Sequence, residues 1–151
     1  MKPLPLNQSE VRTLLAEGRV EVRREVKPQL ENCDLLIPVQ GRWMADCGEE
    51  EPMEIPCPLP PGTDVWVQEA WCAGDKEPCD CLPTCCEHLP AIHYRADWRG
   101  LEDDVIWRPA MQLPCWAARL FGRIASVSVE QRESKWGWCY VVQRTEESGQ
   151  W

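Results

Sequence analysis

The spacing of apolar residues predicts a single helix near the start of the chain. Residues 9–17 place Val11, Leu14 and Leu15 on one helical face. Ser9 is the expected N-cap, because its hydroxyl can accept a hydrogen bond from a free backbone N–H of the first turn. Gly18 is expected to end the helix, since glycine readily adopts the left-handed conformation found there.

Alternation of apolar and polar residues predicts strands along the rest of the chain. In residues 20–26 the valines share one side with Arg24, whereas Arg23 points to the other side. Further strands are expected at residues 35–39, 64–71, 92–96, 120–130 and 138–144, with a short turn or helix at 113–119. Gly122 indicates a bulge or a close backbone approach within its strand. One helix and several strands without βαβ spacing predict an α+β fold or a β-barrel.

Length and composition predict one globular domain over residues 1–151. No stretch approaches the ~20 apolar residues that a membrane helix needs. The first six residues, MKPLPL, are too short and too rich in proline for a signal peptide. We therefore expect a cytoplasmic protein, in which the ten cysteines are thiols or metal ligands rather than disulfides.

The net charge of −9 at first argues against nucleic acid as a ligand, because phosphate binding requires Lys and Arg. The charge is unevenly distributed, however. Residues 46–104 contain fifteen acidic and three basic side chains, whereas residues 1–45 and 105–151 each have a small basic excess. A basic face built from the two ends of the chain is therefore compatible with the overall charge. The acidic middle segment could instead imitate nucleic acid or dock on a basic protein.

A cysteine-rich, proline-rich insert occupies about residues 72–104. Within it, five thiols and one imidazole lie within seventeen residues, and zinc prefers four such sulfur or nitrogen ligands. Paired Cys-x-x-Cys motifs at ribbon spacing are absent, so free thiols in a variable insert are the alternative. The expected ligands of a structural zinc come from Cys79, Cys81, Cys85, Cys86 and His88.

Basic residues after the opening helix are candidates for ligand binding. Arg23, Arg24 and Lys27 fall within five positions, although the two arginines point to opposite faces of a strand. A guanidinium binds phosphate through two parallel hydrogen bonds or stacks on a base. The alternative is a pair of surface arginines balanced by Glu21 and Glu25.

A second group of candidates surrounds Glu69. This carboxylate stands among apolar residues next to Trp71, where loss of water can raise its pKa and make it a base. Trp71 and Trp107 can each offer a ring face to a nucleobase, with core packing as the alternative. Arg95 and Arg108 are candidates for ligand binding, and either is alternatively a structural partner of Glu69.

Four blocks of sequence resemble the ASCH family of the PUA-like superfamily, of the type common in phages and prophages. The first block, residues 18–29, contains Gly18-Arg19 and Arg23-Arg24. The second, residues 57–71, has a Gly-Thr-Asp turn before a strand that ends in Glu69-Ala70-Trp71. The others are residues 94–97 and residues 107–119, which begin with Trp-Arg-Pro. The resemblance implies a twisted mixed β-barrel, with the early helix flanking a cleft and the cysteine-rich loop as an insert. It also implies a bacterial host cell as the setting.

The resemblance implies binding of RNA or modified bases, and in some members hydrolysis. The catalytic members have a Gly-x-Lys-Thr block after the first helix, and here Gly18-Arg19 is followed by Val20-Glu21. Three functions therefore stay open. The favoured one is a module that binds single-stranded RNA, DNA or a nucleotide. The others are a hydrolase acting on a modified base or RNA with Glu69 as its base, and an acidic factor that inhibits a host protein.

Overall fold

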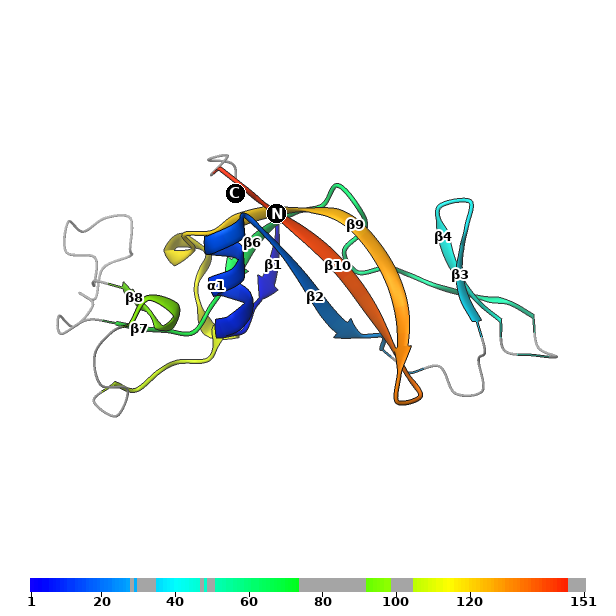
Figure 1. The fold of residues 1–151 in the computed structure, drawn as a ribbon, viewed down its shortest axis with the longest axis horizontal. Coiled ribbons are helices and arrows are strands. Elements are labelled where there is room, and N and C mark those ends of the chain that lie inside the picture. Colours follow the sequence, from blue (N-terminus) through cyan, green and yellow to red (C-terminus); the bar gives the residue numbers. More distant parts are fainter. Residues whose placement is uncertain are drawn as a thin grey trace.

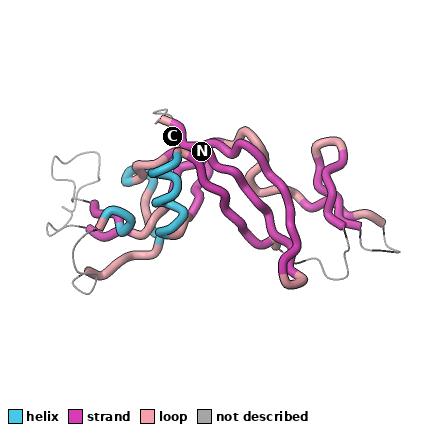
Figure 2. Tube along the Cα trace, viewed as in Figure 1, coloured by secondary structure: helices cyan, strands magenta, loops and turns pink. Residues whose placement is uncertain are grey.

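The computed structural model describes residues 1–27, 29, 35–46, 48, 51–73, 92–98 and 105–146. Over these residues the protein has an α+β fold, built mostly of strands with one early α-helix. The helical segments lie in the same half of the molecule as strands β7 (Trp71–Ala73) and β8 (Ile92–Tyr94), as Figure 2 shows. None of these helices combines the length and the apolar character that crossing a bilayer requires.

Helix α1 (Gln8–Glu17) starts two residues earlier than expected, because Asn7 is its N-cap instead of Ser9. The Asn7 side chain accepts a hydrogen bond from the Glu10 backbone N–H, and the Glu10 carboxylate accepts one from the Asn7 N–H. This reciprocal capping box satisfies two otherwise free donors. The expected end is confirmed: Gly18 has a φ of 71°, in the left-handed region, and its N–H donates to the Leu14 carbonyl.

The main sheet has five strands in the order β1-β6-β9-β10-β2. Its members are β1 (Lys2–Pro5), β2 (Arg19–Glu25), β6 (Asp64–Gln68), β9 (Phe121–Arg132) and β10 (Lys135–Thr145). Only the β1–β6 pair is parallel. The sheet is mixed, and the described strands do not close into a barrel. Figure 1 shows β9 and β10 as long curved strands that run from the α1 side toward the β3–β4 hairpin.

A second sheet has the order β3-β4-β5, with β3 (Leu35–Val39), β4 (Arg42–Asp46) and β5 (Met53–Ile55). Gln40 and Gly41 connect β3 to β4 with φ values of 51° and 76°, which is the geometry of a tight hairpin turn. Pro38 lies in the edge strand β3, where its missing N–H limits pairing with a further strand. This sheet contacts the main sheet through Trp43 and Trp138, whose rings pack edge to face with their centroids 5.5 Å apart.

The sequence predicted most strand positions well but missed three strands. The expected strands at 35–39 and 120–130 correspond to β3 and β9, and the expected 64–71 strand is interrupted at Glu69-Ala70 between β6 and β7. Strands β1, β4 and β5 were not predicted. β1 contains two prolines, which the edge of a sheet tolerates and which hide a strand from pattern analysis.

Gly122 lies where neighbouring strands approach closely, as predicted from a glycine within a strand. A Cβ built there would stand 2.8 Å from Val142 Cγ1 and 3.0 Å from the Gln143 carbonyl oxygen. We expect Gly122→Ala to lower the free energy of unfolding by about 1–3 kcal/mol, because a backbone oxygen cannot move aside. Gly137→Ala is the matched control: the three heavy atoms nearest its Cβ all belong to the Arg23 guanidinium, the far end of a side chain that can rotate away more easily than backbone. Urea denaturation of both variants tests the difference, and equal losses would contradict it.

Candidate functional site

Strands β7 and β8, together with residues 107–108, form a small ladder with two distinct faces. Trp71 pairs with Tyr94 in the ladder and also with Arg108 through an isolated bridge. Paired residues point to the same side of a sheet, so these three side chains share what we call the inner face. Cys72 pairs with His93 and faces the other way. We call that side the outer face.

The inner face holds a buried ion pair between Glu69 and Arg119. Glu69 is 1% exposed. The Arg119 guanidinium donates from Nε to Glu69 Oε2 at 3.0 Å and from Nη2 to Oε1 at 2.8 Å. Its remaining nitrogen, Nη1, pairs with Asp97 of the short helix η1 (Arg95–Asp97). Arg119 therefore connects the end of β6 to η1.

The same guanidinium lies over the ring of Tyr94, 4.2 Å from its centroid, and the Tyr94 hydroxyl donates to the Ala117 carbonyl. Arg108 similarly lies over the Trp71 ring at 5.1 Å. Trp71 is buried with Leu113 and Ala117 in a small satellite core. The inner face is thus a packed layer in which each arginine already has an aromatic partner.

Burial raises the pKa of Glu69, and the hydrogen bonds and positive charge of Arg119 offset part of this rise. Burial likewise raises the pKa of Tyr94, with the Glu69 charge adding to the effect. Since both Glu69 oxygens accept hydrogen bonds from Arg119, neither is directed at an open site. In this arrangement the carboxylate orients Arg119 and is not placed to take a proton from a substrate.

The outer face carries a row of three aromatic side chains. The ring centroids of His93 and Trp98 lie 5.8 Å apart, and those of Trp98 and Trp107 lie 5.5 Å apart. Both pairs pack edge to face. His93 is exposed, and the two indoles are half-buried. The buried Trp107 Nε1 donor has no hydrogen-bond acceptor among the described residues. We call His93, Trp98 and Trp107 the outer aromatic row.

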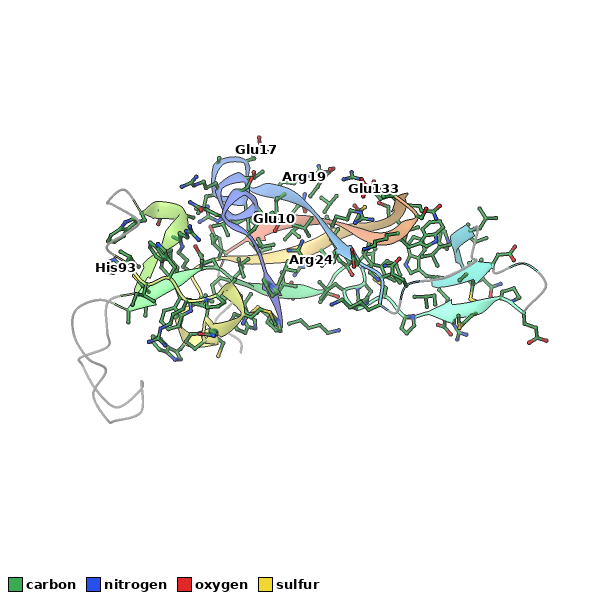
Figure 3. The ribbon with its side chains drawn as sticks, turned by 90° about the horizontal axis from the view of Figure 1, so that it is seen from below. Glu10, Glu17, Arg19, Arg24, His93 and Glu133 are labelled. Carbon is green, nitrogen blue, oxygen red and sulfur yellow. The ribbon has the colours of Figure 1, made fainter. Side chains whose placement is uncertain are left out.

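The two arginines predicted after the opening helix point in opposite directions, as their alternation required. Arg24 donates to both Glu10 oxygens, at 3.1 and 3.2 Å, and to the Pro5 carbonyl at 2.6 Å. Figure 3 shows Arg24 beside Glu10 near the middle of the molecule, whereas His93 lies toward the β8 end. Arg23 instead pairs with Glu130 at 3.1 Å on the far face of the sheet, next to a surface pocket of ≈ 350 Å³.

The predicted binding residues therefore fall into separate groups. Arg24 and Glu69 belong to different ion-pair networks, and Trp71 and Arg108 contact each other. Lys27 is exposed just after β2, and Arg95 begins η1. The structure does not pair Glu69 with Arg95 or Arg108, the partners that the sequence suggested. Its partner is Arg119, which lies fifty positions away.

The predicted zinc ligands Cys79, Cys81, Cys85, Cys86 and His88 lie outside the described residues. Within residues 1–27, 35–46, 51–73, 92–98 and 105–146, no group of three or more Cys, His, Asp or Glu side chains is arranged to hold a metal ion. The zinc site therefore stays a prediction from sequence.

Sequence reasoning missed Arg119, Asp97 and Trp98. Arg119 and Asp97 fell within the blocks that resemble the ASCH family, yet no spacing rule links them to Glu69 because the contact joins three distant segments. Trp98 was not singled out from the sequence at all.

Comparison with known proteins gives no relative to guide the assignment: no family model, no curated protein and no solved structure matches this chain.

Proposed function

We propose that this chain is an ASCH-type member of the PUA-like superfamily that binds single-stranded nucleic acid or a modified nucleotide. The four sequence blocks at residues 18–29, 57–71, 94–97 and 107–119 support the family assignment. An early helix that leads directly into a strand of a mixed sheet fits the same assignment. In this proposal the described sheet is part of the twisted barrel of that superfamily.

The outer aromatic row is the observation that carries the proposal. It gathers two indoles and an imidazole, all at least partly accessible, on one side of the β7–β8 ladder. Unpaired bases stack on such rings, and each stack contributes ~1–3 kcal/mol. Arg108 is adjacent in sequence to Trp107 but faces the inner side, where its guanidinium lies over the Trp71 ring. The outer aromatic row is therefore proposed to contribute stacking rather than charge.

The acidic balance of the chain shapes the expected binding. With a net charge of −9, long-range attraction of a polyanion is weak, so stacking must supply most of the affinity. Binding is then expected to favour single strands over duplexes, because bases in a duplex are already stacked. Salt is expected to weaken binding only modestly.

Fluorescence anisotropy with labelled single-stranded RNA and DNA oligomers at low salt tests this function. We expect Trp107→Ala to weaken binding about 5- to 150-fold, the equivalent of one lost stack. Trp116→Ala is the matched control, because Trp116 is also exposed but lies outside the outer aromatic row. The proposal fails if no oligomer binds, or if the two variants lose the same affinity.

The other two functions find no specific support. A hydrolase with Glu69 as base would need that carboxylate free of Arg119. A host-protein inhibitor would act through the acidic segment 72–104, of which only residues 72–73 and 92–98 are described. Both stay predictions from sequence.

A further inference from the structure

The two faces of the β7–β8 ladder differ in what covers their aromatic rings. On the inner face, the Arg108 guanidinium lies over Trp71 at 5.1 Å, and the Arg119 guanidinium lies over Tyr94 at 4.2 Å. On the outer face, no cationic side chain of the described residues lies over the Trp107 ring. The negative face of an aromatic ring attracts a cation. The inner rings obtain their cations from the protein itself, whereas the Trp107 ring is available to a cation from a ligand.

The arginines of the neighbouring elements do not serve Trp107. They are Arg12, Arg95, Arg108 and Arg119. Arg12 donates from Nε to a backbone carbonyl of η1 at 3.3 Å, and Arg119 is held by the carboxylates of Glu69 and Asp97. Arg95 is half-buried at the start of η1, and Arg108 lies on the inner face. A cation on Trp107 would therefore have to come with the ligand.

The rings of the outer aromatic row stand nearly at right angles to one another. The interplanar angle is 70° between His93 and Trp98, and 82° between Trp98 and Trp107. A flat ligand that stacks on one of these rings therefore turns its edge toward the neighbouring ring. The edge of a positively charged ring is attracted to an aromatic face. This arrangement suits a planar cation.

The charge of the surrounding chain also favours a cation. His93 and Trp98 belong to residues 46–104, which contain fifteen acidic and three basic side chains, and the whole chain has a net charge of −9. Such a charge repels phosphate and raises the local concentration of cations. A nucleic acid whose recognised base is positively charged offsets this repulsion at the point of contact.

We propose that the outer aromatic row recognises a positively charged methylated base in single-stranded nucleic acid, such as 1-methyladenine, in preference to a neutral base. This inference rests on the proposed function and specifies its ligand. Methylation of a ring nitrogen gives adenine a positive charge at neutral pH. The cationic base then combines stacking on the indole with attraction to the ring face. A methylated ammonium on a protein side chain is not planar and lacks the stacking contribution, so the base is the favoured ligand.

Fluorescence anisotropy at pH 7 tests this preference with labelled single-stranded DNA oligomers that differ only in one central base. The three bases are adenine, 1-methyladenine and 6-methyladenine. The last two each carry one methyl group, but methylation of the exocyclic nitrogen leaves 6-methyladenine neutral. We expect the 1-methyladenine oligomer to bind about 2- to 30-fold more tightly than either of the others, which is the range for one cation–π contact.

Trp107→Leu identifies the ring responsible. Leucine keeps an apolar side chain at this position but removes the aromatic face, so the variant is expected to bind both methylated oligomers equally. Trp116→Leu is the matched control, because Trp116 is 42% exposed and lies outside the outer aromatic row. It should keep the full preference. Thermal melts establish whether both variants fold, and the wild-type comparison of the three oligomers decides the question even if Trp107→Leu does not fold.

Three results would overturn the inference. Equal affinity for all three oligomers removes the preference and leaves the proposed function standing. An equal gain for both methylated oligomers indicates contact with the methyl group instead of the charge. A trimethyl-lysine peptide that displaces the labelled 1-methyladenine oligomer more effectively than the same oligomer without label indicates a protein ligand. If no oligomer binds, the proposed function fails and the inference fails with it.

Discussion

Arg119→Met is expected to lower the free energy of unfolding by about 3–5 kcal/mol, because it leaves the Glu69 carboxylate buried without its cation. The variant also releases Asp97 and so frees η1 from the end of β6. Urea denaturation at neutral pH measures the loss. Arg123→Met is the matched control: its ion pair with Asp64 is exposed, and the expected loss is about 0–1 kcal/mol.

The pH dependence of the Arg119→Met loss identifies its cause. Burial already raises the pKa of Glu69, and removal of the guanidinium must raise it further. A carboxyl with a raised pKa in the folded state binds its proton more readily there than in the unfolded chain, so acidification stabilises the fold. The difference in the free energy of unfolding between wild type and Arg119→Met should therefore become smaller from pH 7.5 toward pH 5. The double variant Glu69→Gln/Arg119→Met should recover most of the loss, and a deficit independent of pH would contradict this account.

Trp138→Ala is expected to cost about 3–5 kcal/mol, the range for removing a large aromatic side chain from a core. Trp138 is 2% exposed on β10 and contacts Trp43 of the second sheet edge to face. Its loss removes core packing in the main sheet and also the contact between the two sheets. We therefore expect limited proteolysis to cut residues 35–46 and 51–55 faster in the variant than in the wild type.

A double-mutant cycle separates these two effects of Trp138. Trp43 is only half-buried, so Trp43→Ala should cost less than Trp138→Ala. The coupling energy of the aromatic pair is expected to be about 0.5–1.5 kcal/mol. A coupling near zero would show that the ring contact does not join the sheets and that packing within the main sheet accounts for the whole loss.

Local patterns predicted what depends on local spacing. The α1 face and the opposed directions of Arg23 and Arg24 follow from the 3.6- and 2-residue periods, and the end of the helix at Gly18 follows from glycine's left-handed conformation. The structure confirms all three. Ser9 was a reasonable N-cap by residue type, but Asn7 forms the cap because Glu10 lies three residues after it and completes the capping box.

The candidate site depends on contacts that no local pattern encodes. Glu69 was singled out correctly as a carboxylate in an apolar setting, but its environment comes from Arg119, Asp97 and Tyr94 on other segments. Arg24 was singled out as a ligand-binding candidate, but it pairs with Glu10 on the adjacent helix, a contact that its own strand pattern does not encode. Only tertiary structure decides which of several acids neutralises an arginine.

The strand order of the main sheet has a consequence for how this protein is made. Strand β2 leaves the ribosome long before β10, its neighbour in the sheet, which places Trp138 beside Arg24. β1 likewise waits for β6. Pairing between such distant segments is slow, and the chain emerges at only about 5–20 residues per second. The nascent chain therefore holds an unpaired β2 until residues 135–145 have been synthesised, and the five-stranded sheet is complete only after that.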